Sequence, residues 1–361
     1  MYMKKMVAGV AAALLAVILA FPCYGISAQN AFVLDAKTGG VLFQKNQDTR
    51  SLIASTTKIM TALVVCEQCN VLDRMRIPKA AVGIEGSSMY LIEGEILTIQ
   101  ELLYGLMLRS GNDAAVALAI YCGGTVEGFA ELMNDKARQL GLENTHFVNP
   151  NGLDAPDHYS TARDLATLAA YAMNNPIFAM TVSAKTVRIG QRDLRNHNKL
   201  LWQYQGADGV KTGYTKKAGR ILVSSAERDG RRLVAVTINA PDDWKDHISM
   251  LDDGFNEFTI QNIVRKGDIL GYAEVESGQY GYVELIANDD FDFPLAKGED
   301  PELILPKPGF IYAPVLAGAV AGNAYICIDD AIVGACPVVY GRTVEQVRAE
   351  KKTILHELFR R

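Results

Sequence analysis

The hydrophobic pattern changes period along the chain. Alternation over residues 31–44, with a turn at Thr38-Gly39-Gly40, predicts a β-hairpin. A central block then carries apolar residues at helical spacing, with a capping box at Thr98 and Glu101. Alternation returns after Ala179. Helices are therefore expected at 58–66, from 101 onward, at 114–120, 129–140 and 161–172, and strands at 181–189, 209–215, 220–226 and 233–238.

This order of strands, helices and strands predicts an α+β domain over residues 29–258. In it, a mainly antiparallel sheet is covered by helices, and the middle helices form a lobe of their own. From residue 259 to 341 the chain is rich in Val, Ile, Tyr, Gly and Pro without helical spacing, which predicts a small all-β domain. That domain holds no cluster of catalytic residue types. It is either a spacer or interaction module, or a stabilising appendage.

The first 28 residues have the layout of a signal peptide. Lys4 and Lys5 precede an apolar run over 7–21, and Ile26-Ser27-Ala28 offers a small-residue cleavage site after Ala28. The run is shorter than the roughly 20 residues that span a bilayer as a helix. Export is therefore expected, with a retained N-terminal anchor as the alternative.

The last segment, residues 342–361, reads as an amphipathic helix. Its apolar residues fall broadly on one helical face, and its basic residues outnumber its acidic ones. A basic amphipathic helix can lie in a membrane interface. The alternative is a terminal helix that packs on its own protein. The apolar residues are Val344, Val347, Ile354, Leu355, Leu358 and Phe359.

Composition limits the number of domains, the partners and the kinds of site that this chain can have. The chain has 361 residues, enough for two domains, and a formal net charge of -5, which gives no indication of nucleic-acid binding. Signal-peptide cleavage would leave an odd number of cysteines, and Cys66 and Cys69 lack the second pair that a zinc site needs. The histidines are scattered without ligand spacing. We expect no structural disulfide, no metal and no cofactor.

The chemistry begins with Ser55 and Lys58. They lie three residues apart at the start of a predicted helix, so their side chains emerge on one face. A serine hydroxyl becomes a nucleophile when a neighbouring base removes its proton, and lysine can be that base when it is neutral. Burial and a second cation, for which Lys211 is a candidate, would lower its pKa. The alternative is a capping serine with a surface lysine, although the apolar flanks favour burial of Lys58.

Ser110-Gly111-Asn112 interrupts a predicted helix between two apolar stretches. In the functional interpretation, Ser110 relays a proton toward the leaving group and Asn112 donates a hydrogen bond to the substrate amide. The alternative is an ordinary turn between two helices.

Lys211-Thr212-Gly213 lies in a predicted strand. Because Gly213 has no side chain, an extended peptide can pair closely with this strand. Lys211 and Thr212 can then hold a terminal carboxylate. The backbone N–H groups of Ser55 and Tyr214 would form the oxyanion hole, worth about 3–4 kcal/mol per donor. The alternative is an exposed strand with a surface lysine.

Together these residues resemble the serine-type D-alanyl-D-alanine carboxypeptidases, the low-molecular-mass penicillin-binding proteins. The resemblance runs from about residue 31 to 258. It implies a β-lactamase/transpeptidase-like fold, acylation of Ser55 with Lys58 as base, and water as the usual acceptor. It also implies a β-rich C-terminal domain and a terminal amphipathic helix on the membrane. Beyond the three motifs, the similar segments are 33–39, 54–61, 109–115, 158–164 and 208–215.

The resemblance also implies partners and location. The expected substrate is the peptidoglycan stem pentapeptide, which would lose its terminal D-alanine, and β-lactams would be covalent inhibitors. The enzyme would act outside the cytoplasmic membrane, with contact to its outer face through the C-terminal helix.

Two other functions are conceivable for a chain with these motifs. A class A β-lactamase needs a carboxylate to drive water onto the acyl-enzyme. No Glu-x-x-Leu-Asn stretch lies between the second and third motifs, and Gly111 stands where those enzymes carry Asp. A non-catalytic envelope scaffold, acting through its β domain and tail, is disfavoured because every motif residue is present.

Overall fold

The computed structural model describes residues 25–306 and 309–347. The chain forms two compact units. Their boundary in the sequence lies between Phe258 and Thr259, where the composition changes. Most of the predicted signal peptide, residues 1–24, and the predicted tail helix from residue 348 onward lie outside the described residues.

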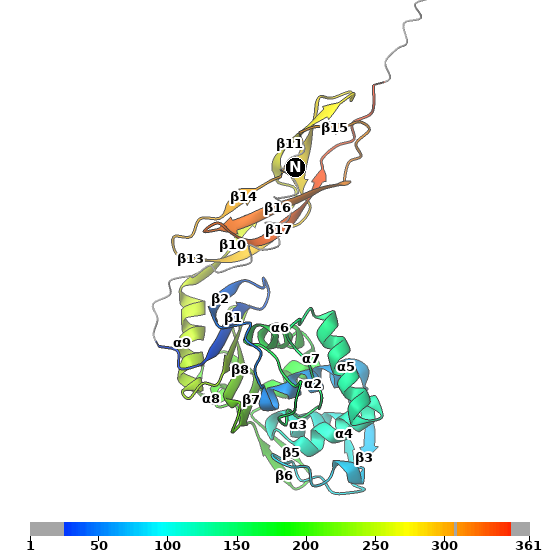
Figure 1. Ribbon diagram of the computed structural model, residues 1–361, viewed down its shortest axis with the longest axis vertical. Helices are drawn as coiled ribbons and strands as arrows, with labels where there is room; N and C mark the ends of the chain where they lie inside the picture. Colours follow the sequence, from blue (N-terminus) through cyan, green and yellow to red (C-terminus); the bar gives the residue numbers. More distant parts are fainter. Residues whose placement is uncertain (1–24, 307–308, 348–361) are drawn as a thin grey trace, which may run out of the picture. The chain divides into compact units, whose positions relative to one another are not determined.

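The first unit is built on a five-stranded antiparallel sheet with the strand order β2-β1-β9-β8-β7 (Figure 1). The predicted first hairpin is present, and its turn is held by the Asp35 carboxylate, which accepts the backbone N–H of Thr38 at 3.0 Å. The strands are β1 Asn30–Asp35, β2 Val41–Lys45, β7 Ala207–Thr215, β8 Gly219–Arg228 and β9 Arg231–Ile238.

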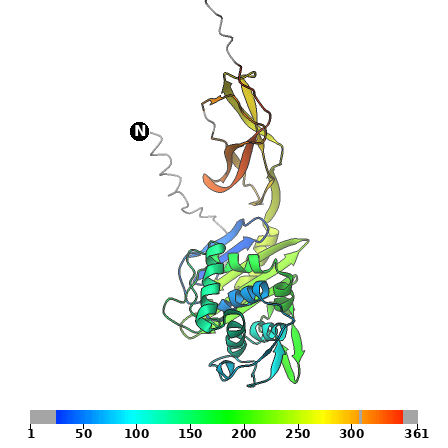
Figure 2. The ribbon, with the colours of Figure 1, turned by 90° about the vertical axis from the view of Figure 1, so that its right-hand side faces the viewer.

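Helices cover both faces of this sheet (Figures 1 and 2). Alternation along β9 explains how, because successive side chains point to opposite faces. Val234 and Val236 join the large core shared with α6, Ala162–Ala172. Thr237 faces the other way and hydrogen-bonds the buried His247 of α9, Asp243–Asn256, with 2.9 Å between Oγ1 and Nε2. The sheet is thus the middle layer of three.

The remaining helices form the predicted lobe beside the sheet. Its central helix is α2, whose residues from Lys58 to Val65 are all buried. The capping box at Thr98 and Glu101 starts α3 as predicted. The elements are η1 Ala54–Thr57, α2 Lys58–Gln68, α3 Ile99–Leu108, α4 Asn112–Gly123, α5 Val126–Gln139, α7 Pro176–Ser183, α8 Leu200–Gln203, η2 Lys79–Ala81, and the hairpins β3 Arg74–Arg76 with β4 Ile96–Thr98 and β5 Thr186–Ile189 with β6 Arg192–Arg195.

Two segments differ from the prediction. The strand expected at 181–189 begins only at Thr186, because residues up to Ser183 belong to α7. That helix is started by the Asn175 side chain, which accepts two backbone N–H groups, and by Pro176 at its first position. The β-branched residues in its last turn gave the misleading strand pattern. Helix α9 was not predicted at all.

The N-terminal residues that the structure describes are integrated into the first unit. Ser27 Oγ donates to the Asp246 carboxylate at 2.7 Å, and the backbone N–H of Ala28 donates to the same carboxylate at 3.1 Å. Asp246 is buried, so loss of these donors would leave its charge poorly compensated. The predicted cleavage after Ala28 would remove these two donors, and the cleavage site stays a prediction.

The second unit is all-β, as predicted. Strands β14-β16-β17-β12-β11-β15 form one sheet and β10-β13 another (Figure 1). Its core is small and includes Val283, Leu285 and Val338. The strands are β10 Phe258–Val264, β11 Ile269–Glu276, β12 Tyr282–Ala287, β13 Phe291–Ala296, β14 Glu302–Ile304, β15 Ile311–Tyr312, β16 Val320–Ile328 and β17 Ala331–Tyr340.

The predicted tail helix is wrong at its beginning. Residues 342–347 are not helical: Val344 pairs with Val315 in an isolated bridge, and Gln346 pairs with Gly278. Val344 is fully buried in the core of the β unit and therefore does not contribute to the apolar face of a helix. The β unit therefore extends beyond residue 341, and only the part of the tail from 348 onward is left outside the described residues.

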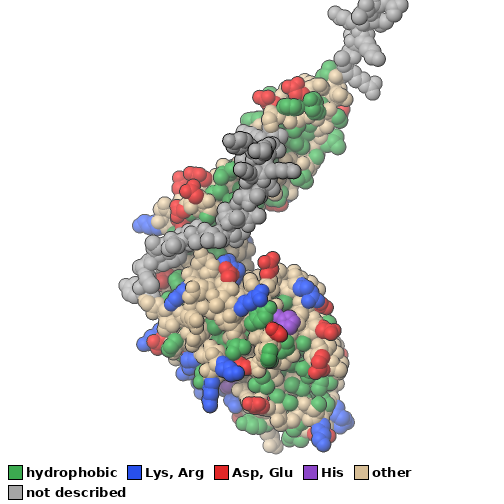
Figure 3. Space-filling view, viewed as in Figure 1, with side chains coloured by type: hydrophobic (Ala, Val, Ile, Leu, Met, Phe, Trp, Pro, Cys, Tyr) green, Lys and Arg blue, Asp and Glu red, His purple; other side chains and the backbone are tan. Residues whose placement is uncertain are grey.

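Cysteines and surface charge add little to this architecture. In the described residues all the cysteines are free, and Cys336 pairs in register with Ala324, not with Cys327. On the face shown in Figure 3, basic and acidic side chains are interspersed over the first unit. Nucleic-acid-binding domains instead gather Lys and Arg on one face.

Candidate active site

Ser55 lies in the short 3-10 helix η1 that leads directly into α2. The backbone before it is strained: Ala54 has φ of 45°, a conformation that non-glycine residues rarely adopt. The loop that carries Gly152 packs so closely here that an added Cβ would collide with the Ala54 carbonyl oxygen. Ser55 is thus presented at the N-terminal end of a buried helix, where backbone N–H groups point outward.

Lys58 is fully buried behind Ser55. Its Nζ lies 3.1 Å from Ser55 Oγ, 2.7 Å from Asn112 Oδ1 and 2.5 Å from the Asn151 carbonyl oxygen. Burial lowers the pKa of Lys58 well below its usual value. The charge of Lys211 lowers that pKa further, whereas Asp113 acts in the opposite direction. These influences favour a neutral amine beside the serine hydroxyl.

The second motif joins α3 to α4 and bends between them. Ser110 has φ of 60°, and its buried Oγ has no hydrogen-bond partner among the described residues. A buried hydroxyl without a partner is unusual and indicates a group reserved for a ligand. Asn112 is fixed from both ends, because its Nδ2 donates to the Glu85 carbonyl while its Oδ1 faces Lys58.

The third motif lies on β7, the edge strand of the sheet. A Cβ at Gly213 would lie 3.3 Å from the Ser55 nitrogen and 3.2 Å from the Ile53 carbonyl oxygen, so only glycine fits here without displacement. The Ser55 nitrogen therefore lies close to β7, the strand on which Tyr214 directly follows Gly213. Lys211 is only 1% exposed; burial lowers its pKa to about 7, and its Nζ donates to the Thr212 carbonyl at 2.8 Å.

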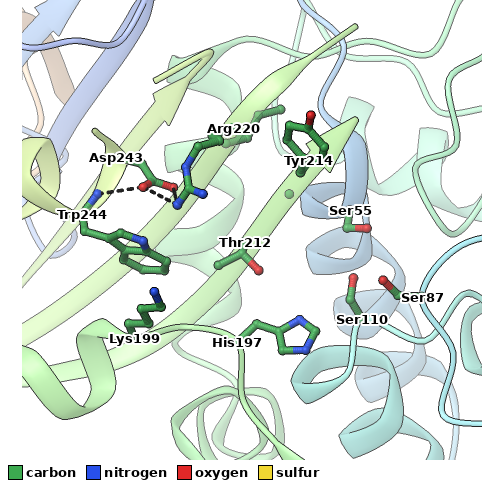
Figure 4. A pocket seen from close by; sticks show the side chains of 12 residues that line it. Ser55, Ser87, Ser110, His197, Lys199, Thr212, Tyr214, Arg220, Asp243 and Trp244 are labelled. Carbon is green, nitrogen blue, oxygen red and sulfur yellow. Dashed lines mark hydrogen bonds and ion pairs between the residues drawn. The ribbon is translucent and has the colours of Figure 1, made fainter. Parts of the chain in front are cut away.

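A pocket of about 330 Å³ opens in front of these groups (Figure 4). Of the residues predicted from the sequence, Ser55, Ser110, Thr212, Gly213 and Tyr214 line it. The predicted residues that lie behind its wall are Lys58, Asn112 and Lys211. Lys58 contacts both Ser55 and Asn112, and Lys211 donates to the Thr212 carbonyl. The structure thus brings all three motifs to one site.

Sequence reasoning missed part of the pocket wall. The residues concerned come from four separate segments, and their types are common on any surface, so no short motif marks them. Only the spatial folding of α9 and the loop before α8 against β7 identifies them. They are Ser87, His197, Lys199, Arg220, Ile221, Asp243 and Trp244.

His158 supports the site from behind. Its Nδ1 accepts the Val148 backbone N–H at 3.1 Å, so its Nε2 carries the proton and donates to Thr57 Oγ1 at 2.8 Å. Burial lowers the pKa of His158 to about 4, which keeps it neutral. This histidine connects the loop that contains Asn151 to the start of α2.

The fold and this constellation define a class: serine-type enzymes of the β-lactamase/transpeptidase-like fold, here with a buried lysine 3.1 Å from a serine hydroxyl. Comparisons with known proteins agree. Residues 19–242 match the family model described as D-alanyl-D-alanine carboxypeptidase, and residues 258–346 match the model of the penicillin-binding protein 5 C-terminal domain. The chain belongs to the D-alanyl-D-alanine carboxypeptidase family.

Relatives and solved structures support the assignment over most of the chain. The chain is 33% identical to the D-alanyl-D-alanine carboxypeptidase DacF of Bacillus subtilis, covering 86% of this chain and 84% of that protein. It superimposes on penicillin-binding protein 5 of Haemophilus influenzae with a TM-score of 0.78 and 30% identity, covering 89% of this chain and 98% of the other. The Streptomyces K15 DD-transpeptidase gives a TM-score of 0.62 and 37% identity, covering 64% of this chain and 97% of the other.

These findings confirm the predicted class of enzyme. The protein is a serine-type D-alanyl-D-alanine carboxypeptidase with the β-lactamase/transpeptidase-like fold and an all-β C-terminal domain. The family acts on peptidoglycan peptides and binds β-lactams, which implies a location outside the cytoplasm. The alternatives of a β-lactamase or a scaffold are not favoured by any of the comparisons.

Proposed function

We propose that Ser55 is the nucleophile and Lys58 the general base that open the terminal D-alanyl–D-alanine bond of a stem peptide. The observation that carries this proposal is the 3.1 Å separation of Lys58 Nζ from Ser55 Oγ in a fully buried setting. A direct test is D-alanine release from a pentapeptide by the mature protein. Absence of release, together with no labelling by a fluorescent penicillin, would contradict the proposal.

The partners of Lys58 explain how its lone pair is aimed. A neutral amine has two N–H groups and one lone pair. Asn112 Oδ1 and the Asn151 carbonyl oxygen can only accept, so they take both N–H groups. The lone pair is then left for Ser55, whose Oγ–H donates to Nζ. Asn112 is in this account a positioning residue for the base, and its predicted contact with the substrate amide stays a prediction.

The other groups complete the acylation step. As Oγ attacks the carbonyl carbon, its proton passes to Lys58 Nζ, and the backbone N–H groups of Ser55 and Tyr214 stabilise the developing oxyanion. The C–N bond then breaks, and Ser110 Oγ relays the proton held by Lys58 to the departing D-alanine amine, which leaves Lys58 neutral. Gly213 lets the substrate backbone approach β7. Water, activated by Lys58, finally attacks the ester and frees Ser55.

The charge of Lys211 predicts a shift in pH dependence. Lys211 lowers the pKa of Lys58, so Lys211→Met should raise that pKa and reduce the fraction of neutral base at any given pH. The acidic limb of the pH profile for acylation by a fluorescent penicillin should therefore move to higher pH. The difference from wild type should be greatest below about pH 7, where Lys211 is itself charged.

Lys136→Met is the matched control for this experiment, since Lys136 is a shielded lysine paired with Glu67 at 2.6 Å outside the pocket. Its profile should follow wild type. A Lys211→Met profile that is lower at every pH but unshifted would contradict the proposed effect on Lys58.

We propose further that the protein rests on the outer face of the cytoplasmic membrane through residues 348–361. Support comes from composition: this segment carries Arg348, Lys351, Lys352, Arg360 and Arg361 among apolar residues. Among the described residues, no single helix is long and apolar enough to cross a bilayer.

Deleting residues 348–361 should therefore abolish sedimentation of the mature protein with anionic vesicles while D-alanine release from a soluble pentapeptide stays unchanged. High salt should weaken binding of the full chain, because attraction between basic residues and anionic lipid is screened. Equal sedimentation of both proteins would contradict membrane contact by the tail.

A further inference from the structure

The inward orientation of Lys211 leaves a substrate carboxylate without its expected partner. Lys211 is 1% exposed and does not line the pocket. Of the residues that do line it, Lys199 and Arg220 are cations. His197 also lines it, but burial and the nearby charges of Lys211 and Arg109 lower its pKa to about 4, so it is neutral near pH 7.

Arg220 is the better positioned of the two cations. Its Nη2 donates to both oxygens of Asp243, at 2.7 and 2.9 Å. Asp243 is buried in the first turn of α9 and also accepts the backbone N–H of Trp244 at 2.9 Å. Lys199 is exposed, and among the described residues it has no such ion pair. Its Nζ lies 5.9 Å from the centroid of the Trp244 ring. The guanidinium is therefore fixed in direction before any ligand arrives.

The ion pair with Asp243 occupies only one edge of the Arg220 guanidinium. Asp243 engages Nη2, which leaves the donors on Nη1 and Nε for a ligand. The Arg220 side chain remains 44% exposed although its partner Asp243 is 3% exposed, and Arg220 lines the pocket. A planar guanidinium with free donors matches a carboxylate better than the point charge of a lysine does.

Sheet geometry places Arg220 on the same side as Thr212. Arg220 is the direct cross-strand partner of Tyr214, and Tyr214 lies two residues from Thr212, so all three side chains share one face of the β7–β8 pair. In the view of Figure 4, Thr212 lies between Ser55 and the group formed by Arg220, Asp243 and Trp244. A ligand that passes from Ser55 over Thr212 thus reaches the guanidinium.

We propose that Arg220, held by Asp243, binds the terminal carboxylate of the substrate together with the Thr212 hydroxyl. This inference rests on the proposed function, since it requires Ser55 to attack the bond that precedes the terminal residue. In this proposal, one residue follows the scissile bond and lies between the nucleophile and the anchor. The enzyme would select a free C-terminus, and Asp243 would be a positioning residue that keeps the guanidinium aimed and its charge compensated.

The test pairs a change in the protein with a change in the substrate. D-alanine or D-alaninamide release is measured for wild type and Arg220→Ala with a pentapeptide that ends in a free acid and with the same peptide ending in an amide. Loss of a charge-assisted hydrogen bond should lower kcat/KM of Arg220→Ala for the acid by roughly 10- to 100-fold. For the amide, wild type and variant should be equally slow. Asp243→Asn should give an intermediate loss, again confined to the acid.

Arg228→Ala is the matched control. Arg228 lies on the same strand β8 and also pairs with a carboxylate of α9, Asp252 at 3.3 Å, but it does not line the pocket. It should keep wild-type discrimination between acid and amide. Thermal unfolding of each variant, and of Arg220→Lys, checks that the fold is intact.

The outcomes separate the two proposals. An Arg220→Ala protein that prefers the acid over the amide as strongly as wild type would overturn the anchor while leaving Ser55 and Lys58 in place. An equal fall with both substrates would also overturn it, because that is the signature of a structural role. Failure of the wild-type protein to release D-alanine would instead contradict the proposed function itself.

Discussion

Replacing Ser55 by alanine is expected to abolish D-alanine release and labelling by fluorescent penicillin together. The reason is covalent: without Oγ no acyl-enzyme forms, and loss of a nucleophile in comparable enzymes lowers kcat by roughly 10⁴- to 10⁶-fold. The fold should survive, because among the described residues the Ser55 hydroxyl has only Lys58 as its hydrogen-bond partner. Release is measured by coupled D-amino-acid oxidation, and folding by thermal unfolding.

Ser183→Ala provides the control for this substitution. Ser183 ends α7, is exposed, and its Oγ donates only locally, to the Met180 carbonyl at 3.2 Å. This variant should label and turn over as wild type does. Labelling of Ser55→Ala at the wild-type rate would mean that another residue is acylated, and the assignment of the nucleophile would be wrong.

The second large effect is expected from Lys58. Lys58→Met keeps much of the side-chain volume but removes the lone pair, and acylation should slow by roughly 1,000-fold or more. Lys58→Arg should be equally slow, because a guanidinium does not lose its proton in proteins and cannot act as a base. The second-order rate constant of acylation by a fluorescent penicillin measures both.

The stability of the Lys58→Met variant gives an independent test of the charge state of Lys58. Lys58 is buried and its pKa is lowered, so the charged form is the costly one in the folded state. Lys58→Met should accordingly leave the unfolding temperature unchanged or raise it near neutral pH. A Lys58→Met protein that acylates within tenfold of wild type would show that the hydroxyl is activated by another group.

The site could be predicted from the sequence only where its chemistry lies in short motifs. Ser55 and Lys58 are fixed by one helical turn, and Ser110 with Asn112 by one bend, so local spacing was enough to identify them. Their meeting with Gly213 could be inferred from the family resemblance alone, since it depends on β7 packing against η1. The inward orientation of Lys211 depends on burial, which a three-residue motif does not encode.

The fold shows the same division. The strands of the main sheet were identified although β8 and β9 are buried on both faces, because their apolar runs are short and contain β-branched residues. Helix α9 was missed although it supplies Asp243 and Trp244 to the pocket. Its buried face includes Asp246 and His247, polar residues that are satisfied by Ser27 and by Ser224 with Thr237. A hydrophobic pattern does not detect a face that is buried through hydrogen bonds to distant residues.

The most direct test of the central claim is to trap the covalent intermediate. The full mature chain is mixed with a pentapeptide, quenched in acid within milliseconds to seconds, digested and analysed by mass spectrometry. We predict an adduct with the mass of the peptide minus D-alanine, carried on the fragment that contains Ser55 and absent from Ser55→Ala. Release of D-alanine with no adduct at any quench time, or with the adduct on another residue, would contradict the account.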